Sequence, residues 1–246
     1  MNEINVWTVL IAATVTAIFT GFGALPFLFV RNVSDRWLGA ANAGAAGLML
    51  GASVGLILEG VEYGFGRLFA GLALGVGLIY ITRKLLEGRE DVSIGDLSGA
   101  TAFRAIMIIG IMTVHSFAEG IGVGVSYGDG MTLGSLITAA IAVHNIPEGL
   151  AISLVLIPRG TSVWKAAGWS IFSSLPQPLM AVPAFLFVLA FRPFLPVGLG
   201  LAAGAMIWMV FAELLPEARE DAPASTIMPV MALAVVGMLM FQFLIG

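Results

Sequence analysis

Residues 132–157 read TLGSLITAAIAVHNIPEGLAISLVLI. The segment is long enough to cross a membrane as a helix, which takes about 20 mostly apolar residues. Its centre nevertheless holds His144, Pro147 and Glu148, and side chains of this kind are costly among lipid. Either another part of the protein offsets that cost, or the segment does not lie in a membrane.

The composition of the whole chain favours a membrane. Its 246 residues are 59% hydrophobic and only 11% charged, with a mean hydropathy of +1.01. A soluble domain carries about 25% charged residues. The length suits one bundle, so we expect a single polytopic transmembrane domain over residues 1–246. The net charge of −4 gives no reason to expect a nucleic-acid partner, and the lack of cysteine excludes thiolate metal sites.

Eight segments are long and apolar enough to span a bilayer, although the third is short and the sixth is long. They cover residues 6–30, 38–59, 65–82, 102–127, 132–157, 163–191, 195–217 and 226–245. The sequence therefore predicts an all-α integral membrane protein with eight transmembrane helices in a single bundle. Glycines that recur four residues apart, as at Gly47, Gly51 and Gly55, predict close packing between helix backbones.

The basic residues predict how the chain is oriented in the lipid bilayer. Of the 11 lysine and arginine residues, all but Arg67 and Arg192 fall in or beside the odd-numbered connections between the predicted helices. Loops rich in positive charge stay on the cytoplasmic side. We therefore expect the long loop at about 83–101 to be cytoplasmic and both termini to lie outside the cytoplasm.

Two predicted helices repeat one pair of polar residues. Residues 115–120 read HSFAEG and residues 144–149 read HNIPEG, so each helix carries His and Glu at i and i+4, which share one helix face. A single such pair is better explained by a core histidine that forms a hydrogen bond with a nearby glutamate. Two pairs that use both histidines of the chain favour metal ligands instead. Nitrogen and oxygen ligands accept zinc, ferrous iron, manganese, cobalt and cadmium alike.

The connection between these two helices predicts that the pairs meet. Only a short turn around Asp129 and Gly130 joins the helices, which makes them antiparallel neighbours. Folding the hairpin there sets His115 level with Glu148, and Glu119 level with His144. At about 1.5 Å per residue, these side chains lie roughly 15 Å deep, which is the middle of a bilayer core about 30 Å thick. Two glutamates and two neutral histidines carry a charge of −2, which one divalent cation neutralises.

The motifs HSFAEG and HNIPEGLA, eight helices and a charged third loop together resemble the ZIP (Zrt-, Irt-like) metal transporter family, in its bacterial GufA-like branch. The resemblance implies a transporter rather than an enzyme, in the inner (plasma) membrane. It implies that a divalent metal, with zinc favoured, passes into the cytoplasm by alternating access. The metal is cargo, and no cofactor is expected. Helices 1–3 and 6–8 would form inverted repeats around helices 4 and 5. The primary ligands would be His115, Glu119, His144 and Glu148.

The sequence departs from the family pattern beside these ligands. Some members hold a second, adjacent metal, and the matching positions here are Ser116, Asn145 and Gln177. None of the three adds a negative charge, so we expect a single bound cation, with Asn145 and Gln177 as neutral auxiliary ligands. An equal alternative for Gln177, which lies between Pro176 and Pro178, is a buried amide that satisfies backbone carbonyls.

Further carboxylates lie toward the ends of the predicted helices. The resemblance suggests that Glu213 is an exit relay for the metal, with a solvated helix end as the alternative. For Glu217 the solvated helix end is favoured. Glu59 and Glu62 are expected at the outer end of their helix, either as interfacial carboxylates or as groups that attract cations to an entrance.

The competing function is an intramembrane zinc-dependent hydrolase. Such an enzyme needs a general base besides its metal ligands. The H-E-x-x-H signature of zinc proteases is not found in the sequence, and two histidines leave little for further chemistry. A homodimer is one open arrangement of the transporter.

Overall fold

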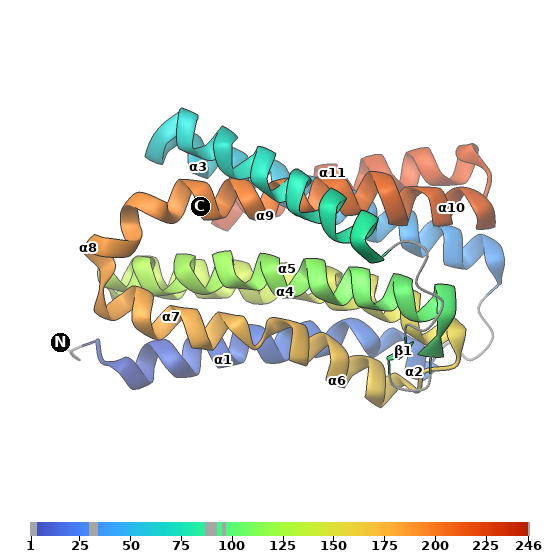
Figure 1. Ribbon diagram of the computed structural model, residues 1–246, viewed down its shortest axis with the longest axis horizontal. Helices are drawn as coiled ribbons and strands as arrows, with labels where there is room; N and C mark the ends of the chain where they lie inside the picture. Colours follow the sequence, from blue (N-terminus) through green and yellow to red (C-terminus); the bar gives the residue numbers. More distant parts are fainter. Residues whose placement is uncertain (1–3, 30–33, 87–92, 95–96, 246) are drawn as a thin grey trace.

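The computed structural model describes residues 4–29, 34–86, 93–94 and 97–245. This part of the chain is nearly all helical (Figure 1). The α-helices are α1 Val6–Gly21, α2 Pro26–Phe29, α3 Asp35–Leu86, α4 Gly99–Gly128, α5 Met131–Leu156, α6 Val163–Ser174, α7 Pro176–Leu186, α8 Val188–Phe191, α9 Leu195–Met209, α10 Leu215–Asp221 and α11 Ala224–Ile245. Short helical turns follow four of them: η1 Phe22–Ala24, η2 Ile157–Arg159, η3 Arg192–Phe194 and the π-helical η4 Val210–Leu214.

The predicted loop at 83–101 contains a small element that the sequence analysis did not predict. Strands β1 (Ser93–Ile94) and β2 (Leu97–Ser98) pair antiparallel, with Ser93 opposite Ser98 and Ile94 opposite Leu97. Residues 87–92 and 95–96 of this loop lie outside the described part of the chain.

Six helices within the described ranges are long and apolar enough to cross a membrane, two fewer than the sequence analysis predicted. They are Val6–Phe29, Asp35–Leu85, Ala102–Gly128, Met131–Arg159, Val188–Asp221 and Ala224–Leu244. The helical character and the capacity to span a membrane are as predicted. The difference in number arises at two places, within α3 and between α5 and α9.

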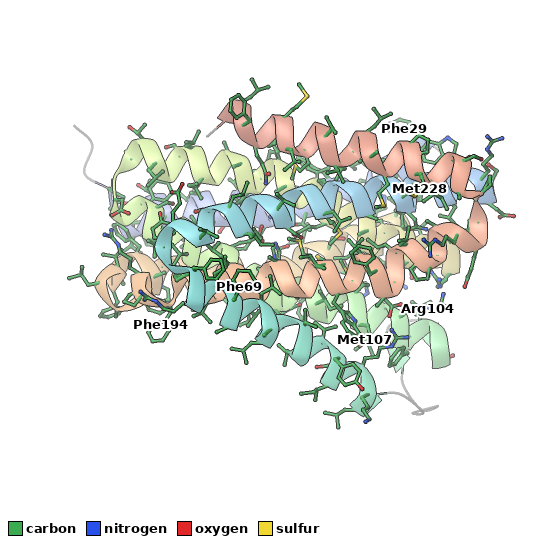
Figure 2. All side chains as sticks on the ribbon, turned by 90° about the horizontal axis from the view of Figure 1, so that it is seen from above. Phe29, Phe69, Arg104, Met107, Phe194 and Met228 are labelled. Atoms are coloured by element: carbon green, nitrogen blue, oxygen red, sulfur yellow. The ribbon has the colours of Figure 1, made fainter. Side chains whose placement is uncertain are left out.

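The first place is the middle of α3, which covers both predicted segments 38–59 and 65–82. Gly64 has φ 145° and ψ 101°, a conformation that side-chain-bearing residues rarely adopt. Two helical limbs meet at this glycine. Figures 1 and 2 show that the limb after the bend runs back in the opposite direction to the limb before it. The two predicted segments are therefore joined without a loop.

The second place is the predicted segment 163–191, which is divided into α6, α7 and α8. Proline has no N–H to donate to a helix, and Pro176 begins α7 directly after the break at Leu175. Phe187, with φ −119° and ψ 41°, ends α7. No single helix here reaches the spanning length, although α6 and α7 follow one another end to end (Figure 1).

Glycines bring the helices into close contact, as their spacing predicts. A Cβ atom added at Gly71 or Gly75 of α3 would lie 2.1 or 2.2 Å from a backbone oxygen of α9. At Gly47, on the other limb of α3, it would lie 2.4 Å from the backbone oxygen of Met231 in α11. Only glycine permits backbones to approach this closely. The limbs of α3 thus pack on α9 and α11 in one layer, beside a second layer of α1 and α4–α7 (Figure 1).

Apolar side chains cover the outside of the bundle as well as its core. Phe29 is 86% exposed and Phe194 is 64% exposed, and Figure 2 shows apolar side chains along the outer faces of the helices. An apolar surface of this extent suits lipid rather than water. The interior, by contrast, encloses polar side chains, which define the candidate site.

Candidate metal centre

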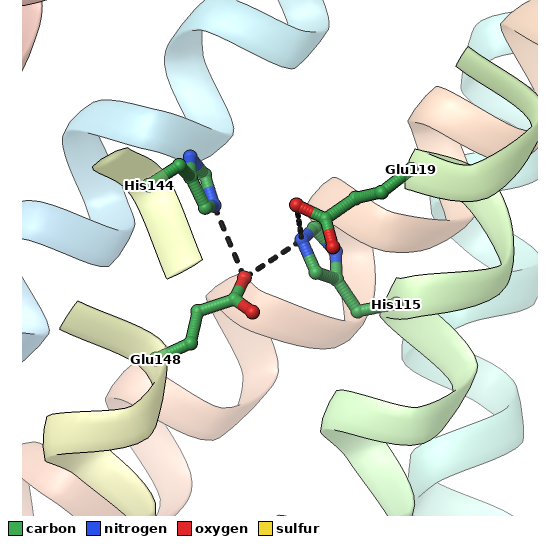
Figure 3. Close-up of side chains that lie close together, drawn as sticks. All are labelled: His115, Glu119, His144 and Glu148. Atoms are coloured by element: carbon green, nitrogen blue, oxygen red, sulfur yellow. Dashed lines mark ion pairs between the residues drawn. The ribbon is translucent and has the colours of Figure 1, made fainter. Parts of the chain in front are cut away.

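The four histidine and glutamate side chains meet between α4 and α5. His115 and Glu119 project from α4, and His144 and Glu148 project from α5 toward them (Figure 3). One ligand atom from each residue lies within 4.8 Å of the others. All four residues are buried, and His115 and Glu148 have no exposed surface. We call these four residues the His/Glu cluster.

Glu148 is the centre of the His/Glu cluster. Its Oε1 lies 2.8 Å from His115 Nε2 and 3.1 Å from His144 Nε2. The Oε1 of Glu119 lies 3.4 Å from His115 Nε2. The two imidazole rings are nearly parallel, with 16° between their planes and 5.6 Å between their centroids. The register predicted from the short turn, with His115 level with Glu148, is therefore present.

The donor set of the His/Glu cluster fits a divalent cation. Both oxygens of Glu148, both ring nitrogens of His115 and Nε2 of His144 are buried without a hydrogen-bond partner in the described part of the chain. Buried polar atoms are normally satisfied, because leaving one unpaired costs about 1–3 kcal/mol. With neutral imidazoles the cluster carries a charge of −2. One divalent ion would neutralise this charge and coordinate the unpaired atoms.

Asn145 and Gln177 adjoin the His/Glu cluster through hydrogen bonds. Gln177 Nε2 donates to Glu119 Oε2 at 2.6 Å, and its Oε1 accepts from Asn145 Nδ2 at 3.2 Å. Thr16 of α1 also takes part: its hydroxyl donates to Gln177 Oε1 at 2.5 Å, and its backbone oxygen accepts from Asn145 Nδ2 at 2.7 Å. The sequence alone did not indicate Thr16, because a threonine in an apolar helix resembles no metal ligand. Its spacing from Thr20, on the same face of α1, was the available signal.

Two predicted site residues lie apart from the four ligands. Ser116 follows His115 in α4 and is fully buried, and its hydroxyl has no hydrogen-bond partner among the described residues. Glu213 lies in η4 and forms an ion pair with Arg83 at 3.4 Å. It lines a separate cavity of about 240 Å³ together with Glu217.

Glu217 differs from the solvated helix end that the sequence analysis favoured. Only 8% of the residue is exposed. Its Oε1 accepts hydrogen bonds from Arg104 Nη1 at 2.9 Å and from Arg159 Nη2 at 2.5 Å. The prediction was wrong because these arginines, which come from α4 and η2, offset the cost of burying the carboxylate.

A second cavity of about 210 Å³ connects the His/Glu cluster with the bent region of α3. Glu119 and His144 line it, as do Glu59 of α3 and Gln242 of α11. Its remaining walls are mostly apolar side chains of α3, α5, α9 and α11. Glu62, the other carboxylate considered for an entrance, is not one of its lining residues.

Comparison with known proteins identifies the family. Residues 87–244 match the ZIP Zinc transporter family. The chain belongs to this family. ZIP family members are transporters and not enzymes, so the hydrolase alternative has no support.

Three relatives show how far the similarity extends along the chain. A putative zinc transporter of Arabidopsis thaliana is 48% identical over 240 residues, which cover 96% of this ZIP protein but 39% of the plant protein. The zinc transporter ZIPB of Bordetella bronchiseptica is 32% identical over 244 residues, or 92% of this chain and 77% of the relative. The zinc transporter GufA of Myxococcus xanthus is 29% identical, with 86% and 88% covered.

Proposed function

We propose that this ZIP protein carries a divalent transition metal, zinc first among them, into the cytoplasm through the His/Glu cluster. The observation that carries the proposal is the burial of two glutamates and two histidines whose ligand atoms converge. Among these atoms, Nε2 of both histidines and both oxygens of Glu148 have no hydrogen-bond partner among the described residues. A cation that binds there satisfies atoms that would otherwise be costly to bury. The names of the relatives, all zinc transporters, support zinc as the cargo.

The proposed arrangement in the membrane has eight crossings within one domain. The two limbs of α3 count as separate crossings, and α6, α7 and α8 together form another. Figure 1 supports an even number of membrane crossings, because α1 begins and α11 ends toward the same end of the bundle. By the distribution of positive charge, that end faces outward in the inner membrane and the loop at 83–101 faces the cytoplasm. The first three and the last three of these eight crossings are proposed as inverted repeats around α4 and α5.

The proposed path of the metal has an entrance and an exit. The cavity lined by Glu59 reaches Glu119 and His144 from the outer side, so that Glu59 can attract a cation toward the His/Glu cluster. Glu213 lies on the opposite side, within the cavity near Arg83, and is proposed as the relay toward the cytoplasm. Alternating access places the binding site between two such openings.

We propose that one cation occupies the His/Glu cluster at a time. A single divalent ion cancels the charge of −2, whereas a second would leave +2 in a dry site, which is costly. Asn145 Oδ1 is neutral, buried and without a hydrogen-bond partner among the described residues, so it is proposed to complete the coordination.

Uptake into sealed liposomes tests the proposal. Purified protein is reconstituted with a zinc-sensitive dye inside the vesicles, and zinc is added outside. We expect uptake by the native protein and none above the protein-free rate for Glu148→Ala. Competition by manganese, ferrous iron, cobalt and cadmium then ranks the metals. Equal uptake by the native protein and Glu148→Ala would show that the site is misassigned.

A further inference from the structure

Gln177 faces the metal centre with its amide nitrogen and not with its oxygen. The backbone oxygen of Thr16 can only accept a hydrogen bond, so the Asn145 atom that lies 2.7 Å from it must be the Nδ2 donor. The Gln177 atom 3.2 Å from that nitrogen must then be an acceptor, which makes it Oε1. The remaining nitrogen, Nε2, is the atom 2.6 Å from Glu119 Oε2. A backbone carbonyl therefore fixes the orientation of both amides.

The oxygen of Gln177 is already in use. A carbonyl oxygen has two lone pairs, and this one accepts from Asn145 Nδ2 and from the Thr16 hydroxyl. That hydroxyl also lies 2.8 Å from the backbone oxygen of Ala13, so its single hydrogen is shared between two acceptors. Gln177, Asn145 and Thr16 are all fully buried. Coordination of a metal by Gln177 would break hydrogen bonds that water cannot replace.

We propose that Gln177 is a positioning residue that holds Glu119 for a single metal ion. This inference rests on the proposed function of the His/Glu cluster. The hydrogen bonds that run from Thr16 through Asn145 and Gln177 to Glu119, which we call the amide chain, turn Glu119 Oε2 toward α7. The other oxygen, Oε1, is thereby left on the side of His115, at 3.4 Å from Nε2.

The amide chain also determines which ions the centre accepts. The Gln177 N–H group beside Glu119 presents a partial positive charge, which disfavours a second cation on that side of the carboxylate. Gln177 therefore favours a single ion in the centre. Glu148 has no comparable amide partner in the described part of the chain, and its Oε1 faces the two imidazole nitrogens at 2.8 and 3.1 Å. Glu119 is thus the carboxylate of the cluster that an amide holds in place.

Two threonines of α1 provide a matched test. Thr16 and Thr20 are both fully buried, and each bonds to a polar side chain of the neighbouring α6–α7 region. Thr16 bonds to Gln177, whereas Thr20 Oγ1 bonds to Ser174 Oγ at 2.7 Å, outside the amide chain. Zinc titration calorimetry on detergent-purified, metal-stripped protein measures the effect of each change. Loss of a group that supports a metal ligand typically weakens metal binding about 10–100-fold.

For the threonines we expect Thr16→Val to weaken zinc binding by about tenfold, the lower end of that range, because its hydrogen is shared. Thr16→Ser keeps the hydroxyl and should bind zinc like the native protein. Thr20→Val should lower thermal stability as much as Thr16→Val but leave zinc affinity unchanged. Equal zinc affinities for Thr16→Val and Thr20→Val would overturn the role of the amide chain.

Variants of Gln177 test its two effects separately. Gln177→Leu should still bind one zinc ion, about 10–100-fold more weakly. Gln177→Glu places a third carboxylate beside Glu119 and should bind two zinc ions. Native binding by Gln177→Leu, one ion in Gln177→Glu, or two ions in the native protein would each overturn the inference. If Gln177→Leu does not fold, the threonine pair decides. If instead the proposed function is wrong, the native protein will bind zinc no better than Glu148→Ala. That result differs from every outcome that contradicts only the role of Gln177.

Discussion

Two buried glutamates in this protein have opposite surroundings. Glu217 is 8% exposed, and its Oε1 lies within 3 Å of two arginine nitrogens, from Arg104 and Arg159. Glu148 has no exposed surface, and the nitrogens nearest to its Oε1 belong to two histidines. A buried carboxylate requires a compensating positive charge. Two arginines of the chain supply that charge to Glu217, whereas for Glu148 we propose that the transported ion supplies it.

The ion pairs of Glu217 also join distant parts of the bundle. Glu217 lies in α10, and its partners lie in α4 and in η2 after α5, so the pairs connect the two layers of helices. Figure 2 shows Arg104 near the opposite end of the molecule from Phe69 and Phe194. Arg104, Arg159 and Glu217 are not among the residues that line the cavity reaching the His/Glu cluster. Glu217 thus joins parts of the fold, whereas Glu148 is proposed to bind the transported metal.

The largest expected effect separates metal binding from stability. Glu148→Gln removes one charge without changing the side-chain volume, and zinc affinity should fall on the order of 100-fold or more, since even supporting groups are worth 10–100-fold. The metal-free melting temperature should stay level or rise, because an uncompensated buried charge is lost. Calorimetry and thermal unfolding in detergent measure the two quantities. A large fall in metal-free stability would make Glu148 a structural residue like Glu217.

Glu217→Gln should have the reverse effect. Breaking a buried ion pair costs about 3–5 kcal/mol, and the partial exposure of both arginines reduces this to about 2 kcal/mol. For a chain of this size the melting temperature should fall by roughly 4–8 °C. Zinc affinity should remain within about twofold of native, since Glu217 does not contact the His/Glu cluster. A loss of zinc binding would instead show that the two regions are coupled.

Acidification should weaken the metal centre. Histidine binds a metal only when its imidazole is neutral, and it ordinarily titrates near pH 6.5. Zinc affinity should therefore fall as the pH is lowered from 7.5 to 5.5, because protons compete with the metal for the imidazole nitrogens. Zinc titrations at both pH values measure it, and a constant affinity would argue that neither histidine binds the metal.

The smallest expected effect on stability concerns Glu213. Its ion pair with Arg83 is long, at 3.4 Å, and partly exposed, so Glu213→Gln should change the free energy of unfolding by less than about 1 kcal/mol. As part of the proposed exit, the same variant should slow zinc uptake into liposomes while zinc affinity stays native. Uptake at the native rate would remove Glu213 from the path.

The amino-acid sequence by itself determined the membrane environment, the family and the four residues of the His/Glu cluster. These features depend on local properties: apolar length, the i and i+4 spacing of His115 with Glu119 and of His144 with Glu148, and one short turn that forces α4 and α5 together. Because the turn sets the register, the convergence of the cluster followed without knowledge of the other helices.

Only the tertiary structure decided how the remaining polar groups are used. Thr16 and Gln177 are separated by 161 residues, and which atom of an amide faces a neighbour depends on the partners that distant helices supply. The burial of Glu217 likewise follows from arginines on two other elements. The bend at Gly64, where two predicted segments join without a loop, required a backbone conformation that glycine permits but does not impose. The spacing of residues along the sequence determines which face of a helix is polar, whereas the packing of the helices determines which side chains that face contacts.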